Sequence, residues 1–214
     1  MGSVLEVKGL CRDFGSRRAI ENLEFSLAAG EILGLVGPSG AGKTVTLRIL
    51  SGALEGSSGT ASICGISVAA GNRKIYELFG AVAENHPLPE QLSPFEYLQL
   101  RACLKKVRDR RREVTRALQI CGLLRFGKRH RIGQLSRGHR QLVALADAIL
   151  GRPALILLDG LEPWQLRLTL EERAGRPAAL VTGRGVAELA GICSKIIFLD
   201  RGRIVGDRGK ERSD

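Results

Sequence analysis

Aromatic residues and long apolar runs are both scarce in this sequence of 214 residues. Phe, Trp and Tyr make up only 4% of it, so a hydrophobic core must be built mainly from Leu, Ile, Val and Ala. No apolar run approaches the roughly 20 residues of a membrane-spanning helix, and the N-terminus lacks the apolar stretch of a secretory signal. The sequence therefore argues against a membrane-spanning protein and favours one compact globular domain.

Cysteine is also used sparsely. The five cysteines are odd in number, scattered along the chain and without the close spacing of metal ligands. This pattern argues against a disulfide framework and against a zinc site. We expect buried, reduced thiols in a cytosolic protein.

Acidic residues are too few to balance the basic ones, which leaves a formal net charge of +11. That charge fits a nucleic-acid binder, a protein at an anionic membrane surface, or an arginine-rich proteome. Six of the eight residues 105–112 are Lys or Arg, in a region expected to be helical. No aromatic residue interrupts this cluster to stack on bases. We therefore expect a solvated helix face and no nucleic-acid partner.

The apolar pattern predicts an α/β fold. Residues 4–7 and 23–27 alternate like antiparallel strands, whereas residues 32–36 are almost continuously apolar, as in a strand buried on both faces. Further strands are expected at residues 154–158, 178–181 and 195–199. Between them, residues 87–150 are helical in character, and Ser93 and Ser136 should each begin a helix.

These elements predict a single domain with an inserted part. Residues 1–86 and 154–205 should form a core in which a mixed sheet carries flanking helices and an N-terminal antiparallel β layer. Residues 87–153 should form an α-helical subdomain, and residues 206–214 a polar tail.

A glycine-rich turn between the strand at residues 32–36 and the helix that follows carries the most specific motif. It reads Gly37-Pro38-Ser39-Gly40-Ala41-Gly42-Lys43-Thr44, which matches the P-loop pattern in full. The glycines let backbone N–H groups converge on phosphates, and the helix directs its positive end at them. Lys43 supplies a cation for the terminal phosphates and Thr44 a hydroxyl for Mg²⁺. The motif predicts a P-loop NTPase core that binds Mg-ATP.

Asp159 directly follows the apolar strand at residues 155–158. P-loop proteins place a second Mg²⁺ contact at the end of such a strand. Asp159 is therefore the second candidate metal ligand.

Leu135-Ser136-Arg137-Gly138-His139, followed by Arg140-Gln141, resembles the signature of ABC ATPases. The order of P-loop, helical insert, signature and Asp-terminated strand resembles these domains over essentially the whole chain. In the family, Ser136 and the Gly138 N–H would face the γ-phosphate of ATP bound to a second subunit. A plain capped helix is the alternative reading of the pentapeptide.

A finer resemblance connects residues 83–98 to the gliding-motility and multidrug ABC-2 exporter group. It implies that Glu84 is the loop residue that reaches Mg²⁺ and the attacking water. The same resemblance makes Phe14 the aromatic that stacks on adenine, with a core phenylalanine as the alternative.

The chain departs from the family where hydrolysis is catalysed. The family has a catalytic Glu directly after the Asp, but Asp159 is followed by Gly160-Leu161-Glu162-Pro163, as if a short segment were deleted. Arg184 stands where the switch histidine is expected. Val45 replaces a hydroxyl residue that would face the α-phosphate. Glu162 is a candidate for a substitute carboxylate, against which stands the restriction that Pro163 places on its backbone.

The resemblance implies an ATP-binding subunit at the inner face of the cell membrane, with ATP and Mg²⁺ as its ligands. Its partners would be a transmembrane permease and a second ABC ATPase subunit in a head-to-tail dimer. A heterodimer with an intact chain is favoured, because this chain lacks catalytic residues. The alternatives are a non-transport ABC protein in DNA repair or translation, and a decayed paralogue.

Overall fold

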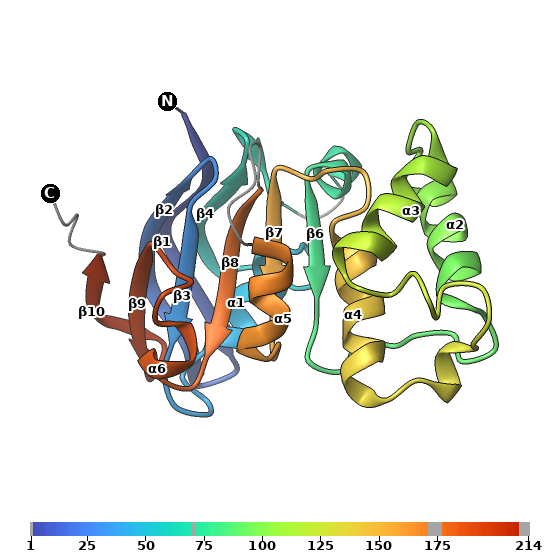
Figure 1. Cartoon of the computed structure of the whole chain (residues 1–214). Helices are drawn as coiled ribbons and strands as arrows, with labels where there is room; N and C mark the ends of the chain where they lie inside the picture. Colours follow the sequence, from blue (N-terminus) through green and yellow to red (C-terminus); the bar gives the residue numbers. More distant parts are fainter. Residues whose placement is uncertain (1, 70–71, 171–176, 210–214) are drawn as a thin grey trace, which may run out of the picture.

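A computed structural model describes residues 2–69, 72–170 and 177–209. Two sheets and a group of helices make up the molecule (Figure 1). The antiparallel sheet has the order β2-β1-β4-β5, with strands β1 (Ser3–Phe14), β2 (Arg17–Ala28), β4 (Ser58–Ile63) and β5 (Ile66–Ser67). The second sheet has the order β10-β9-β3-β8-β7-β6, with strands β3 (Ile32–Val36), β6 (Phe79–Val82), β7 (Leu155–Leu158), β8 (Ala178–Gly183), β9 (Lys195–Asp200) and β10 (Arg203–Gly209).

The second sheet is mixed because only its edge strand β10 runs antiparallel to its neighbour. Its central strands are buried on both faces, which explains their continuous apolar sequences. In β3, Ile32 and Val36 pack into one hydrophobic core, whereas Leu33 and Leu35 pack into another on the opposite face. The predicted fold class, with a mixed sheet, flanking helices and an antiparallel β layer, is confirmed.

The helices are distributed over both faces of this sheet. Helix α1 (Lys43–Leu50) shares its core with the antiparallel sheet, while α5 (Pro163–Leu170) and α6 (Val186–Leu189) follow β7 and β8. Helices α2 (Pro94–Leu104), α3 (Arg110–Ile120) and α4 (Arg137–Ala148) lie together beyond β6 (Figure 1). Two 3₁₀ turns, η1 (Arg73–Glu77) and η2 (Ile132–Gln134), complete the elements.

Both expected helix starts are confirmed. The Ser93 hydroxyl accepts a hydrogen bond from the Glu96 N–H, and the Glu96 carboxylate accepts one from the Ser93 N–H, which completes a capping box at α2. The Ser136 hydroxyl accepts a hydrogen bond from the His139 N–H and caps α4. No helix in the described ranges combines the length and the apolar character needed to cross a bilayer.

The basic cluster at residues 105–112 is not one solvated helix face. It spans the end of α2, a turn and the start of α3. Lys105 is largely buried, and its Nζ lies 2.9 Å from a carboxylate oxygen of Asp147 on α4. Arg101 reaches the same carboxylate with its Nε at 2.9 Å. These ion pairs attach α2 to α4, so part of the basic charge stabilises the packing of the helices.

Two smaller expectations are also corrected. Cys121 and Cys193 are buried as expected, but Cys64 and Cys103 are exposed. The polar tail was expected from Gly206, yet residues 206–209 belong to β10 and pair with β9. The polar sequence of β10 fits an exposed edge strand as well as a tail. Residues 210–214 of the expected tail lie outside the described residues.

Candidate functional site

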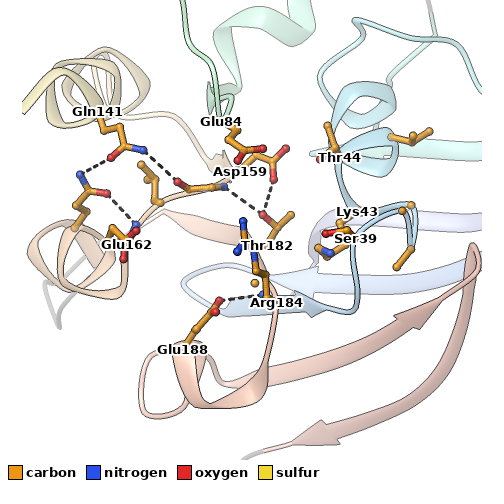
Figure 2. Close-up of a pocket in the computed structure, with 18 of the residues that line it drawn as sticks. Ser39, Lys43, Thr44, Glu84, Gln141, Asp159, Glu162, Thr182, Arg184 and Glu188 are labelled. Atoms are coloured by element: carbon orange, nitrogen blue, oxygen red, sulfur yellow. Dashed lines mark hydrogen bonds between the residues drawn. The ribbon is translucent and has the colours of Figure 1, made fainter. Parts of the chain in front are cut away.

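A large cleft lies at the carboxyl ends of four parallel strands. Strands β3, β8, β7 and β6 run in the same direction and end near one another, at the edge where α/β proteins bind their ligands. The cleft has a volume of about 1090 Å³ and is shown in Figure 2. Its walls come from the loop after β3, the loops after β6, β7 and β8, and the start of α4.

Most residues expected to bind nucleotide line this one cleft. They are Phe14, Ser39, Gly40, Ala41, Gly42, Lys43, Thr44, Val45 and Gly138. The expected Mg²⁺ and carboxylate residues Glu84, Asp159 and Glu162 line it too. Residues separated by more than a hundred positions are therefore brought together. Phe14 is 44% exposed, so it is not the core phenylalanine of the alternative interpretation.

Lys43 is held in place by the loop that precedes it. Its Nζ donates hydrogen bonds to the carbonyl oxygens of Gly37, at 2.6 Å, and Pro38, at 2.9 Å. Burial lowers the pKa of its amino group, the nearby Asp159 raises it and Arg184 lowers it. Gly37 and Pro38 thus shape the loop through their carbonyls rather than as cleft-lining residues. The ammonium group stands where α1 directs its positive end, a favourable place for phosphate.

The position after Thr44 has no hydroxyl, and its neighbour does not replace one. Val45 is partly buried in the cleft wall. Thr46 is fully buried, and its hydroxyl donates to the Gly42 carbonyl at 3.0 Å, inside the first turn of α1. A nucleotide in this cleft therefore loses one side-chain hydrogen bond that the P-loop could have supplied.

Asp159 has a partner that the sequence did not indicate. Its side chain is 8% exposed, and its Oδ1 accepts a hydrogen bond of 2.6 Å from the Thr182 hydroxyl at the end of β8. The Thr182 hydroxyl also accepts a weaker bond from the Gly160 N–H at 3.4 Å. Asp159 and Thr182 are brought together because β7 pairs with β8. The contact could be predicted from the sequence only by knowing that these two strands are neighbours.

The backbone after Asp159 leaves no room for a side chain. Gly160 has a φ of +70°, and a Cβ on it would lie 2.8 Å from the Cγ of Glu84. A Glu at this position, where the family has its catalytic residue, would thus be strained and would meet the loop carboxylate. The shortened connection is built around a glycine turn rather than around a base.

Glu162 directly precedes α5 and is exposed at the cleft wall. Its N–H donates to Gln165 Oε1 at 2.9 Å. Gln165 is fully buried, and its Nε2 donates to the Gly138 carbonyl at 3.1 Å and to Gln141 Oε1 at 3.3 Å. Gln141 Nε2 in turn donates to the Gly160 carbonyl at 3.2 Å. Figure 2 shows this network, which connects the start of α5 to the start of α4.

Arg184 follows β8 and its side chain points into the cleft (Figure 2). Its N–H donates to a Glu188 carboxylate oxygen at 2.9 Å, which fixes the turn into α6. Among the described residues that line the cleft, the cations are Arg17, Lys43, Arg137 and Arg184. Histidine is not among these residues; His86, His130 and His139 lie elsewhere.

Ser136 lies outside the cleft that holds the other candidate residues. Its hydroxyl is 2.8 Å from Nδ1 of His139, one turn further along α4. Gly138 reaches the cleft rim, where a Cβ on it would lie 3.7 Å from the Trp164 ring. The motif therefore presents the N-terminus of α4 beside this cleft rather than into its phosphate-binding end.

Sequence reasoning missed several cleft residues, chiefly Arg17, Trp164, Gln165 and Thr182. None of them belongs to a short contiguous motif with a chemical role of its own. Gln165 had the strongest available signal, because it is a polar residue in the first turn of a helix.

Comparison with known proteins decides the family. A protein-family model described as "ABC transporter" matches residues 20–164, which is more than half of the chain. The chain belongs to the ABC transporter family. It is an ATP-binding subunit of that family, as its relatives are.

Two relatives illustrate the likeness of this ABC subunit. The uncharacterized ABC transporter ATP-binding protein YhcH of Bacillus subtilis is 31% identical over 96% of this chain and 70% of its own length. A probable multidrug ABC transporter ATP-binding protein, YbhF of Escherichia coli, is 30% identical over 95% of this chain and 37% of its own length.

Solved structures agree with the fold. An ATP-binding subunit of an ABC transporter superposes with a TM-score of 0.85 at 27% identity, covering 97% of this chain and 90% of that one. A bacterial ABC transporter cassette solved as a dimer gives a TM-score of 0.83 at 24% identity, covering 97% and 99%. The predicted membership of the ABC family is confirmed.

Proposed function

We propose that this subunit binds Mg-ATP on its own P-loop and hydrolyses it poorly, and that it works with a membrane permease and a second ATPase subunit. The observation that carries the proposal is the contrast inside one cleft. On one side, the P-loop holds the Lys43 ammonium group in a position that suits phosphate. On the other side, the connection after Asp159 makes a turn at Gly160, which has no side chain to act as a base.

The residues in the cleft fit Mg-ATP. Lys43 and the α1 N-terminus would face the terminal phosphates, and Phe14 would lie under the adenine. No group of three or more His, Cys, Asp or Glu within the described ranges could hold a metal by itself. Mg²⁺ is commonly held by one or two carboxylates together with the phosphates. Thr44, Asp159 and Glu84 supply such a set, and Mg²⁺ would neutralise charge on the phosphates.

Hydrolysis at this site lacks its expected residues. A positioned base commonly contributes about 10²- to 10⁴-fold to a rate. Gly160 has no side chain to supply it, and the guanidinium of Arg184 carries only N–H donors, so it can bind phosphate but offers no acceptor for a proton. Glu162 lies on the cleft wall, but its N–H is committed to Gln165 at the start of α5, which keeps it with that helix.

A second ATPase subunit would supply the hydrolysis that this chain lacks. The dimeric cassette is a structural relative of this chain, and the relatives named above are transporter subunits. In a head-to-tail dimer, Ser136 and the Gly138 N–H of this chain would serve the nucleotide of the partner. A heterodimer with a catalytically intact partner gives one working site and one silent site. The complex would lie at the cytoplasmic face of the membrane.

The proposal is tested by comparing Ser136→Ala with Lys43→Ala in the reconstituted complex. Ser136→Ala should abolish most ATPase and transport, because it damages the working site. Lys43→Ala should reduce them less, because it empties a site with little turnover. Ser51→Ala, at the C-cap of α1, is the matched control for serine removal, because Ser51 is half-buried and its hydroxyl donates a hydrogen bond to the Arg48 carbonyl. A larger loss in Lys43→Ala than in Ser136→Ala would contradict the silent-site proposal.

A further inference from the structure

The wall of the nucleotide cleft includes the hairpin formed by β1 and β2. Phe14 ends β1 and Arg17 begins β2, with only Gly15 and Ser16 between them. Phe14 and Arg17 are directly opposite each other in the hairpin, so their side chains leave the same face of it. Both line the cleft. The hairpin therefore presents an aromatic ring and a guanidinium group together to a molecule in the cleft.

The ring of Phe14 has a cation on one face. The Arg12 guanidinium carbon lies 4.5 Å from the ring centre, and an Arg12 terminal nitrogen donates a hydrogen bond of 2.9 Å to the Glu55 carbonyl. This cation–π contact covers one face of the ring. A flat ligand group such as a base can therefore stack only on the opposite face.

The two adjacent arginines of this hairpin differ in their surroundings. Arg18 is paired across the hairpin with Asp13, and its Nε lies 2.9 Å from Asp13 Oδ1. Its Nη1 lies 3.7 Å from Glu21 Oε1. Arg17 forms no ion pair with any residue that the structure describes. The charge of Arg18 is thus neutralised, whereas that of Arg17 is available to an anionic ligand in the cleft.

The start of β2 packs against the P-loop. A Cβ on Gly42, which has a φ of +106°, would lie 2.9 Å from the Ala19 carbonyl oxygen, so glycine allows this close approach. Ala19 and Val45 line the cleft together with Arg17. The strand therefore holds Arg17 beside the wall that joins Phe14 to the first turn of α1.

A nucleotide that spans the cleft passes along this wall. The inference rests on the proposed function, in which the base lies on Phe14 and the terminal phosphates lie at Lys43. The ribose and the α-phosphate connect these two ends of ATP. They therefore come opposite the stretch of wall that carries Arg17 and Val45.

Arg17 is suited to bind a phosphate at this point. Val45 offers only methyl groups, and the neighbouring Thr46 hydroxyl donates inward to the Gly42 carbonyl at 3.0 Å. A guanidinium group binds phosphate oxygens through charge-assisted hydrogen bonds, often two at a time. Its long side chain also lets it reach a phosphate from the neighbouring strand.

We propose that Arg17 is a phosphate-binding residue of the nucleotide cleft, which holds the α-phosphate and compensates for the hydroxyl that Val45 lacks. ATP and ADP both carry this phosphate. Arg17 therefore strengthens the binding of both nucleotides to a similar degree. Lys43, in contrast, acts on the terminal phosphates.

Binding is measured on the full chain, by competition of ATP and ADP against a fluorescent ATP analogue in the presence of Mg²⁺. Arg17→Gln should weaken the binding of both nucleotides by about tenfold, because charge-assisted hydrogen bonds are lost. Arg18→Gln is the matched control, because it removes the same charge from the same hairpin, and it should change each Kd by less than about twofold. Thermal unfolding without nucleotide checks that both variants fold.

Two further measurements test which phosphate is bound. ATP with one sulfur on its α-phosphorus exists as two diastereomers, and the wild type should bind them with different affinities. Arg17→Gln should reduce this difference. Val45→Thr, which replaces a methyl group by a hydroxyl, should recover about threefold or more of the affinity in Arg17→Gln and less in the wild type.

The outcomes separate this inference from the proposed function. Unchanged ATP affinity in Arg17→Gln, beside a wild type that binds Mg-ATP, would overturn the inference and leave the proposed function standing. A loss confined to ATP would also overturn it, by assigning Arg17 to the γ-phosphate. Equal losses in Arg17→Gln and Arg18→Gln would reduce it to a general attraction between charges. A wild type that binds no Mg-ATP would refute the proposed nucleotide binding and this inference with it.

Discussion

The two sides of the cleft follow two strands of one sheet, β3 and β7, which are separated by β8, but the two sides differ in regularity. On one side, β3 leads through the loop from Gly37 into α1, and Lys43 is held by two carbonyls of that loop. On the other side, β7 leads through Asp159 into a left-handed turn at Gly160 and a short α5. The first side has the complete P-loop motif, while the second has Asp159, the proposed metal ligand, followed by a glycine at Gly160 where the resemblance implies a catalytic carboxylate.

This difference between the two sides separates the binding of ATP from its hydrolysis. Phosphate binding depends on backbone N–H groups and one cation, which a contiguous loop provides by itself. Hydrolysis also needs a carboxylate at a defined place, and that place depends on the length of the connection between two strands. In the proposed function, the short connection after Asp159 removes the capacity for hydrolysis and leaves phosphate binding intact.

The largest expected effect concerns Lys43. Mg-ATP at about 100 times its Kd should stabilise the wild type by roughly 2.7 kcal/mol, and Lys43→Ala should lose most of this gain. The variant removes the cation that faces the terminal phosphates. Thermal unfolding with and without Mg-ATP measures it, with the exposed Lys74→Ala as the control for lysine removal. Equal stabilisation of both variants would refute nucleotide binding at the P-loop.

The second expected effect is an absence of rescue. Gly160→Glu, alone or with Arg184→His, should leave the ATPase rate of the purified chain near background. The new side chain begins from a left-handed backbone and meets Glu84, so its carboxylate is displaced. Phosphate release measures the rate. A rise of about 10²-fold or more in the double variant would show that the base position is intact.

The contiguous features were predictable and the tertiary ones were not. The P-loop, the Ser93 capping box and the Ser136 cap are each encoded within a few residues, so spacing alone identified them. The Thr182 bond to Asp159 and the Gln165 network depend on which strands and helices are neighbours. The basic cluster at residues 105–112 misled for the same reason, because the partner of Lys105 is Asp147 on another helix.

The smallest expected effect is structural and lies on the irregular side. Gln165→Ala removes hydrogen bonds to Gly138 and Gln141 and leaves buried groups unpaired, so it should lower the free energy of unfolding by about 1–3 kcal/mol. Urea unfolding measures this change. Glu162→Gln is the matched control, because Glu162 is exposed and should stay within about 0.5 kcal/mol. A neutral Gln165→Ala would mean that the network does not hold α5 against α4.

The central claim, that ATP is held and not turned over, is tested most directly by recovering the bound nucleotide. The purified chain is mixed with limiting radiolabelled ATP and Mg²⁺, and the protein-bound nucleotide is analysed over time. An intact ABC site with an ordinary turnover of about 1–10³ s⁻¹ would convert it within seconds. We predict that the bound nucleotide remains ATP over minutes. Conversion to ADP within seconds, lost in both Lys43→Ala and Glu162→Gln, would contradict the account and identify Glu162 as the base.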